Sequence, residues 1–110
     1  MYTLKSVVAM YELEYFPEVK EDLSKLPLEV LQEVANYFDK YQTDPYKYSS
    51  KLYNQSGLNL DGYRKTYVAN AAYRIVIKIE DGVAKVVEVV AVGERKDKRV
   101  YEEAYLRIYK

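Results

Sequence analysis

The chain of 110 residues contains no cysteine, no histidine and no tryptophan, and only four glycines and three prolines. Without cysteine there is no disulfide, thiolate metal site or thiol nucleophile. Without histidine the commonest general base and zinc ligand is missing. The acidic residues do not have the spacing of a calcium-binding loop. We therefore expect no metal ion and no cofactor, which excludes many classes of enzyme.

Long hydrophobic runs are missing as well. The longest apolar stretches, such as VVEVVAV at residues 86–92, are interrupted by charge and fall far short of the roughly 20 residues that a membrane helix needs. The first 16 residues carry one early lysine, but acidic residues follow directly and no small-residue cleavage site is evident. We therefore expect a cytoplasmic protein that does not contact a membrane.

Residues 1–110 are expected to form a single domain, because the length fits one hydrophobic core and is too short for two. The net charge is zero, but it is unevenly distributed: residues 1–44 carry four basic and nine acidic side chains, a net charge of −5. Residues 45–79 carry six basic side chains and one acidic side chain. This asymmetry is compatible with an anionic partner or with a self-compensating surface, and composition alone does not decide between them.

The first 42 residues predict one strand and two helices. Residues 8–15 are rich in β-favouring residues and end at Pro17, which indicates a strand. Pro17 and the acidic residues after it favour a short helix that ends near Pro27. A longer helix should follow Pro27, with an apolar stripe of residues spaced by three or four: Leu28, Leu31, Ala35, Phe38 and Gln42. The two helices should form a hairpin that covers a sheet, because both have an apolar side to bury.

The rest of the chain predicts a loop, three strands and a helix. Residues 43–63 are rich in Asp, Pro, Ser, Asn and Gly and indicate a long, functional loop, with an irregular strand from about Leu58. Three β-rich runs follow at residues 63–69, 71–81 and 84–93, the last two joined by a hairpin turn.

The last 15 residues predict a helix, with Val100, Ala104 and Ile108 recurring every fourth position. Asp97 is available as its N-cap. The order β-α-α-β-β-β-α predicts an α+β domain with a mainly antiparallel four-stranded sheet, covered on one face by the helical hairpin.

The segment from Arg95 to Tyr101 places four basic side chains, one carboxylate and a tyrosine in seven positions. Such a run is most often a solvated surface. In the predicted meander, however, the strands that carry Arg64 or Lys65, and Arg74, are neighbours of this segment. Arginine provides paired donors that match phosphate oxygens, and tyrosine rings stack on the bases of single-stranded nucleic acid. We therefore expect one basic, aromatic surface that binds RNA.

In this order the segments at residues 19–38 and 60–101 resemble the RelE/ParE toxin superfamily. There a helical hairpin precedes a Tyr-Arg strand, a hairpin turn and a Val-Gly-x-Arg segment, with a tyrosine six positions after the arginine. The match spans about residues 10–108. The resemblance implies a RelE-like fold and a bacterial or archaeal toxin whose RelE branch cuts mRNA in the ribosomal A site without a metal ion. It also implies a cognate antitoxin, which neutralises the groove and displaces the C-terminal helix.

The motif places its functional residues on Arg74, Arg95 and Tyr101. The resemblance implies that they surround the scissile phosphate and the neighbouring base. The ribose 2′-hydroxyl would attack the phosphate, and the two arginines would stabilise the developing charge. RNA binding is assigned to the basic side chains around this site: Arg64, Lys96, Lys98 and Arg99.

The general base is less clear. Active ribonucleases of this family place two lysines, or a Glu and His pair, on the strand before Tyr-Arg, whereas this chain offers only Arg64 and Lys65 there. Lys65 would serve if neighbouring positive charges favoured its neutral form. Active members are also usually strongly basic overall, and this chain is neutral. The sequence therefore leaves open whether the chain is an active enzyme.

Two alternatives remain beside the ribosome-dependent ribonuclease. One is a ParE-like inhibitor of DNA gyrase, and the other is a non-catalytic, repurposed binding protein of the same fold. If the chain is a ribosome-dependent ribonuclease, its expected partners are the antitoxin and mRNA on the ribosome. The sequence does not give the oligomeric state.

Overall fold

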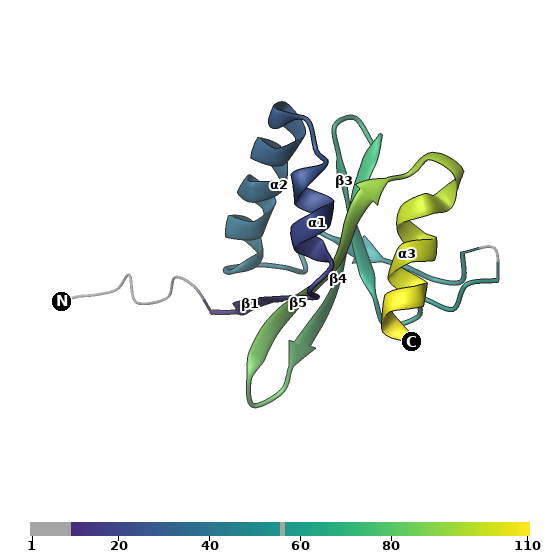
Figure 1. Ribbon diagram of the computed structural model, residues 1–110. Helices are drawn as coiled ribbons and strands as arrows, with labels where there is room; N and C mark the ends of the chain where they lie inside the picture. The colour runs from purple at the N-terminus through teal and green to yellow at the C-terminus, as the bar shows by residue number, and fades with distance from the viewer. Residues whose placement is uncertain (1–9, 56) are drawn as a thin grey trace.

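The computed structural model describes residues 10–55 and 57–110, which form an α+β fold with a mixed, mainly antiparallel sheet (Figure 1). The strands are β1 (Glu12–Tyr15), β2 (Ser50–Lys51), β3 (Arg64–Val68), β4 (Tyr73–Asp81) and β5 (Lys85–Glu94). The helices are α1 (Val19–Ser24), α2 (Leu28–Tyr41) and α3 (Arg99–Ile108), and a short 3₁₀ turn, Lys96–Lys98, precedes α3. The predicted order of elements is confirmed apart from one additional short strand, β2. Residues 8 and 9 of the first predicted strand lie outside the described residues.

The sheet has five strands in the order β1-β5-β4-β3-β2, where four strands were predicted. The additional strand, β2, comes from the segment that was predicted to be loop, and it pairs only with the first two residues of β3. A two-residue edge strand has too little alternation to stand out from the Ser-rich and Asn-rich sequence around it. β1 is parallel to β5, and the other neighbours are antiparallel.

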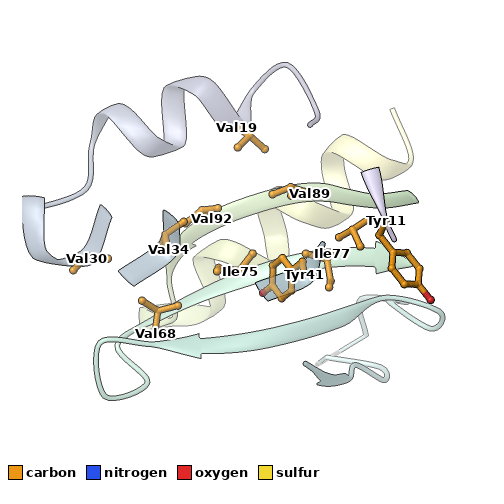
Figure 2. Close-up of a cluster of buried hydrophobic side chains, with 11 residues drawn as sticks. Tyr11, Val19, Val30, Val34, Tyr41, Val68, Ile75, Ile77, Val89 and Val92 are labelled. Atoms are coloured by element: carbon orange, nitrogen blue, oxygen red, sulfur yellow. The ribbon is translucent and has the colours of Figure 1, made fainter. Parts of the chain in front are cut away.

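Both faces of the sheet are covered, with α1 and α2 on one face and α3 on the other (Figure 1). Ile75, Val76 and Ile77 of β4 are consecutive and have no exposed surface. Strands that are buried on both sides read as continuous apolar runs, which explains this stretch. Figure 2 shows the core on the side of α1 and α2, and it includes Val19, Val34 and Tyr41.

A second core lies beneath α3. Its buried members are Leu52, Leu60, Val76, Val90, Ala91, Val100, Tyr101 and Ala104. The sequence predicted an apolar, amphipathic C-terminal helix, and this core shows where its apolar side packs. Tyr101 is therefore part of this core, and it also lines a surface hollow beside Arg74.

The predicted buried stripe of α2 was right only in part, since Phe38 packs partly buried against the core. Val30, Val34 and Tyr41 are the buried residues of this helix, whereas Leu28 is 67% exposed. Both stripes fit the helical period, so spacing alone did not choose between them. On the observed face Tyr41 is buried, and its hydroxyl forms a hydrogen bond with the side chain of Thr66 in β3. This bond satisfies the buried hydroxyl, as burial of a polar group requires.

A buried ion pair anchors α3 to α1 around the edge of β5. β1 pairs with β5 only as far as Val89, and side chains complete the edge beyond it. Asp22 accepts a hydrogen bond from the backbone N–H of Val92 (3.0 Å), and Arg107 donates to the Val90 carbonyl (2.9 Å). The two charged groups meet in a bidentate pair of 2.7 and 2.8 Å. This network holds the helix that carries Tyr101 in place.

No helix within the described ranges combines the length and the apolar character that crossing a membrane would require.

Candidate functional site

Arg74 lies at the start of β4, directly opposite Tyr67 of β3. Residues that face each other across paired strands point to the same side of the sheet, so the Arg74 guanidinium lies over the Tyr67 ring, with its central carbon 3.8 Å from the ring centroid. Its Nε donates a hydrogen bond of 2.8 Å to the Tyr101 hydroxyl. Another guanidinium nitrogen donates to the Ala71 carbonyl at 2.8 Å. Arg74 is only 7% exposed and is held by three partners.

The turn between β3 and β4 has an unusual backbone. Ala69, Asn70 and Ala71 have positive φ angles of 54°, 55° and 72°, a region that costs energy for residues with a side chain. The turn directs the Ala71 carbonyl at Arg74 and the Ala72 carbonyl at the backbone N–H of Arg95, 3.0 Å away. It therefore brings the start of β4 and the end of β5 together.

The segment between β5 and α3 is also unusual, because Asp97 and Lys98 both have positive φ angles, of 56° and 58°. The prediction that Asp97 caps α3 was wrong. The residue before the helix is Lys98 in the left-handed conformation, and no side-chain cap is formed. The physical reason is the backbone, since the left-handed Asp97 and Lys98 turn the chain so that Lys98, and not Asp97, occupies the position before the helix.

These elements enclose a hollow of about 400 Å³, which we call the Arg74 hollow. Its lining residues are Gln55, Lys65, Tyr67, Arg74, Arg95, Asp97, Lys98 and Tyr101. Four of them are basic and one is acidic, so the hollow favours an anion. The structure thus brings together the four residues for which the sequence suggested catalysis: Lys65, Arg74, Arg95 and Tyr101.

The residues suggested for RNA binding are placed differently from one another. Lys98 lines the Arg74 hollow. Lys96 lines an adjoining hollow of about 790 Å³, which shares Arg74 and Arg95 with the first. Arg99 is exposed at the start of α3 and lines neither hollow.

Arg64 lies apart from this group. Its Nε donates to the Ser49 hydroxyl at 2.7 Å, and its guanidinium lies 5.1 Å from the centroid of the Tyr46 ring. Successive residues of a strand point to opposite faces, so Arg64 and Lys65 cannot both face the Arg74 hollow. The pairing of β3 with β4 selects Lys65, which lies two residues before Tyr67 on the same face.

The protonation of Tyr101 follows from its surroundings. Burial raises the pKa of the Tyr101 hydroxyl, and the hydrogen bond from Arg74 and the charges of Arg74 and Arg95 oppose this shift only in part. The hydroxyl is therefore protonated at neutral pH. Because its oxygen accepts the bond from Arg74, its own hydrogen is free to be donated to a bound group.

Lys65 lies at the rim of the Arg74 hollow. Its ammonium group donates a hydrogen bond of 3.3 Å to the Lys51 carbonyl and lies 5.5 Å from the centroid of the Tyr67 ring. The interaction with Lys51 ties the rim to the edge strand β2. Lys65 is therefore positioned by the same short strand that the sequence did not predict.

Two lining residues, Gln55 and Asp97, were missed as site residues. Gln55 belongs to the long segment after α2, whose length was the signal that it has a functional role. Asp97 is the lone carboxylate in the basic run, and its position there was the available signal. Within residues 10–55 and 57–110, no three acidic side chains gather closely enough to hold a metal ion.

The fold of the chain is similar to solved structures of a toxin and of toxin–antitoxin complexes. No family model and no curated protein matches the sequence. A free-state mutant of the Escherichia coli toxin RelE superposes with a TM-score of 0.67 at 25% identity, covering 89% of this chain and 97% of that one. The Mycobacterium tuberculosis RelBE2 toxin–antitoxin complex gives 0.61 at 23% identity, covering 77% and 98%.

An archaeal RelE–RelB complex from Pyrococcus horikoshii gives a TM-score of 0.57 at 17% identity, covering 78% of this chain and 96% of that one. These likenesses span bacteria and archaea and most of each chain. The chain therefore has a RelE-like toxin fold, and the resemblance that the sequence suggested is confirmed at the level of the fold.

Proposed function

We propose that this chain is the toxin of a RelE-type toxin–antitoxin pair and that the Arg74 hollow cleaves mRNA on the ribosome. The observation that carries the proposal is the meeting of Arg74, Arg95 and Tyr101 in one basic hollow. Arg74 comes from β4, Arg95 directly follows β5, and Tyr101 comes from α3. Their positions match the motif of the family. The RelE-like fold supports the same reading.

The two arginines have different tasks in this proposal. Arg74 is buried and held by Tyr67, Ala71 and Tyr101, so its charge is fixed in place before a substrate binds. Arg95 is exposed at the mouth of the hollow and contacts the phosphate as it enters. Fixed positive charge of this kind stabilises the negative charge that develops on the phosphate in the transition state.

The proposed reaction is a transesterification, in which phosphorus exchanges its bond to the 5′-oxygen for a bond to the 2′-oxygen. The ribose 2′-hydroxyl loses its proton and attacks the adjacent phosphorus, and the bond to the 5′-oxygen of the next nucleotide breaks. The products are a 2′,3′-cyclic phosphate and a free 5′-hydroxyl. Tyr101 donates a proton to the leaving 5′-oxygen, since its hydroxyl is protonated and its hydrogen is not used by Arg74.

The proton of the 2′-hydroxyl needs an acceptor, and two titratable side chains of the Arg74 hollow are candidates. The sequence suggested Lys65. Asp97 is the carboxylate among the lining residues, and Asp and Glu carboxylates are common general bases in enzymes. We assign the role of general base to Asp97 and a phosphate-binding role to Lys65.

The partner that controls the toxin is an antitoxin. Several of the matching structures are toxin–antitoxin complexes, among them those from M. tuberculosis and P. horikoshii. An acidic segment would neutralise the four basic side chains of the Arg74 hollow and exclude RNA. In this chain such a segment acts by covering the hollow, because the Asp22–Arg107 pair resists displacement of α3.

A reconstituted translation reaction tests the proposed function. Purified chain is added to ribosomes that carry a defined mRNA, and the ends of the fragments are mapped. Wild type should produce cleaved mRNA with 2′,3′-cyclic phosphate ends, and Arg95→Ala should abolish the cleavage. Arg99→Ala is the matched control, because Arg99 is a nearby exposed arginine outside both hollows. Intact mRNA in the presence of folded wild type would refute the proposal.

A non-catalytic binding protein is the second candidate. The observation that favours it is the engagement of Arg74, whose guanidinium already has a ring and two hydrogen-bond acceptors as partners. The zero net charge agrees with this candidate. It predicts that the chain binds RNA or an acidic protein through the Arg74 hollow but leaves mRNA uncut.

A further inference from the structure

A further hollow, of about 290 Å³, adjoins the Arg74 hollow at the edge of the sheet, and we call it the edge hollow. Its lining residues are Tyr37, Lys47, Tyr48, Ser49, Ser50, Lys65, Thr66 and Tyr67. The Arg74 hollow and the edge hollow share Lys65 and Tyr67. A chain lying in the Arg74 hollow can therefore continue into the edge hollow across β3.

Three separate parts of the fold form the edge hollow. Tyr37 comes from α2, Lys47 and Tyr48 come from the segment before β2, and Lys65 and Tyr67 come from β3. β2 pairs only with Arg64 and Lys65, so the hollow lies where this pairing stops. Its residues are thus gathered by the tertiary fold, although they are far apart in sequence.

Cations and tyrosine rings lie next to one another throughout this surface. Lys40 lies 5.1 Å from the Tyr37 ring centroid and 5.2 Å from that of Tyr48. The Nζ of Lys47 lies 5.5 Å from the centroid of the Tyr48 ring. The Arg74 hollow repeats this arrangement with Tyr67, which has Arg74 at 3.8 Å and Lys65 at 5.5 Å.

The charge of the edge hollow is also distinctive. None of its lining residues is acidic. Lys40 is one of only four basic residues in the first 44, a part of the chain with a net charge of −5. The fold nevertheless places this lysine beside Tyr37 and Tyr48. Positive charge therefore continues out of the Arg74 hollow and onto the otherwise acidic α2.

We infer that the edge hollow binds the single-stranded RNA that extends from the phosphate cleaved in the Arg74 hollow. Single strands are held by a positive groove that follows the backbone and by aromatic rings on which bases stack. Tyr48 provides the ring and Lys47 provides charge within the edge hollow. Lys40 does not line the hollow but adds charge beside it, next to the rings of Tyr37 and Tyr48. This inference rests on the proposed function, because it assigns RNA to the Arg74 hollow.

The test uses two labelled RNAs whose 2′-hydroxyls are replaced by fluorine, so that neither can be cut. One is a trinucleotide that fits the Arg74 hollow, and the other is an octanucleotide that reaches beyond it. Affinities are measured by fluorescence anisotropy over a range of salt concentrations. The double variant Lys40→Gln/Lys47→Gln is compared with Lys20→Gln/Lys25→Gln, which removes the same charge from exposed positions of α1 and the residue that follows it.

The Lys40→Gln/Lys47→Gln variant should bind the octanucleotide at least about 10-fold more weakly and the trinucleotide as wild type does. Its salt dependence should have a slope smaller by about 1.4, because each phosphate contact on a single strand contributes about 0.7. Tyr48→Leu should weaken octanucleotide binding roughly 5- to 150-fold through lost stacking. The Lys20→Gln/Lys25→Gln control should match wild type.

The outcomes separate this inference from the proposed function. If wild type binds the octanucleotide and the Lys40→Gln/Lys47→Gln variant binds it equally well, the edge hollow is not an RNA site, while the proposed function stands. If wild type binds neither RNA, the inference fails, and the cleavage assay on ribosomes decides the proposed function separately. If Lys40 and Lys47 are instead needed to bind an acidic peptide, with RNA affinity unchanged, the surface belongs to a protein partner and the inference is overturned.

Discussion

The Nε of Arg74 donates a hydrogen bond of 2.8 Å to the hydroxyl of Tyr101, and this bond joins β4 to α3. Both residues are almost fully buried, at 7% and 5% exposure. The bond links the stability of the fold to the geometry of the Arg74 hollow, because the same helix that closes the second core also carries the tyrosine of the site.

Replacing Tyr101 with Phe should reduce the free energy of unfolding by about 1–3 kcal/mol, because it leaves a buried, charged donor without its acceptor. Urea denaturation followed by circular dichroism measures this change. Tyr105→Phe is the control, since Tyr105 lies one turn further along α3 and does not line the Arg74 hollow. Equal stability of the two variants would show that the bond to Arg74 does not support the fold.

The Asp22–Arg107 pair should be a major anchor of α3, because the two side chains are only 7% and 11% exposed. Removing one member of a buried pair leaves the other unpaired, which costs about 3–5 kcal/mol. Asp22→Ala should therefore lower the unfolding free energy by this amount and speed hydrogen exchange of the α3 amides. Lys110→Ala, which breaks a more exposed pair with Glu18, should change little. Unaltered exchange in α3 of Asp22→Ala would contradict the anchoring role.

Asp81 should make the stability of the protein depend on pH. Its carboxylate accepts hydrogen bonds from Lys85 at 2.6 Å and from Tyr11 and Tyr46 at 3.1 Å each. The bond from Lys85, followed by those from Tyr11 and Tyr46, lowers the pKa of Asp81 below its usual 3.8. The stabilising contribution is therefore complete above about pH 4 and is lost as the pH falls through the lowered pKa in the folded state.

The comparison of wild type with Asp81→Asn checks this prediction. The difference in urea midpoint should be largest near neutral pH and should shrink below pH 3.8. Asp61→Asn, at an exposed turn position, should show no such trend. If the difference between wild type and Asp81→Asn did not shrink as the pH was lowered below 3.8, the three hydrogen bonds to the carboxylate would not stabilise the fold.

The identity of the general base can be decided by two substitutions. Asp97→Asn should lower the cleavage rate by about 10²- to 10⁴-fold, the usual contribution of a general base. Lys65→Met should weaken substrate binding and leave the maximal rate within a few-fold of wild type. Single-turnover cleavage at saturating protein separates the two effects. The reverse pattern would assign the base to Lys65, as the sequence suggested.

Much of the fold was predictable from the sequence because the signals were local. The apolar runs of β4 and β5 and the turn between them indicated a hairpin, and Pro17 and Pro27 marked the starts of the first two helices. What local signals could not give was the choice between equally spaced alternatives. α2 has two apolar stripes, and only its packing against the sheet, with Tyr41 bonded to Thr66, selects one of them.

The site was predictable in part for a similar reason. Arg74, Arg95 and Tyr101 stood out through the motif, and strand pairing brings them together. Arg64 and Lys65 are adjacent in sequence, so composition could not tell which faces the Arg74 hollow, whereas the alternation along β3 does. Asp97 was misread because the expected cap depends on helix geometry, and the left-handed Lys98 changes the entry into α3.

The most direct test of the account is to map the ends of an mRNA after incubation with ribosomes and the purified chain. We predict fragments that end in a 2′,3′-cyclic phosphate and begin with a free 5′-hydroxyl, formed by wild type and by Arg99→Ala but not by Arg95→Ala. If folded wild type leaves the mRNA intact, or if Arg95→Ala cuts as fast as wild type, the Arg74 hollow is not a ribonuclease site.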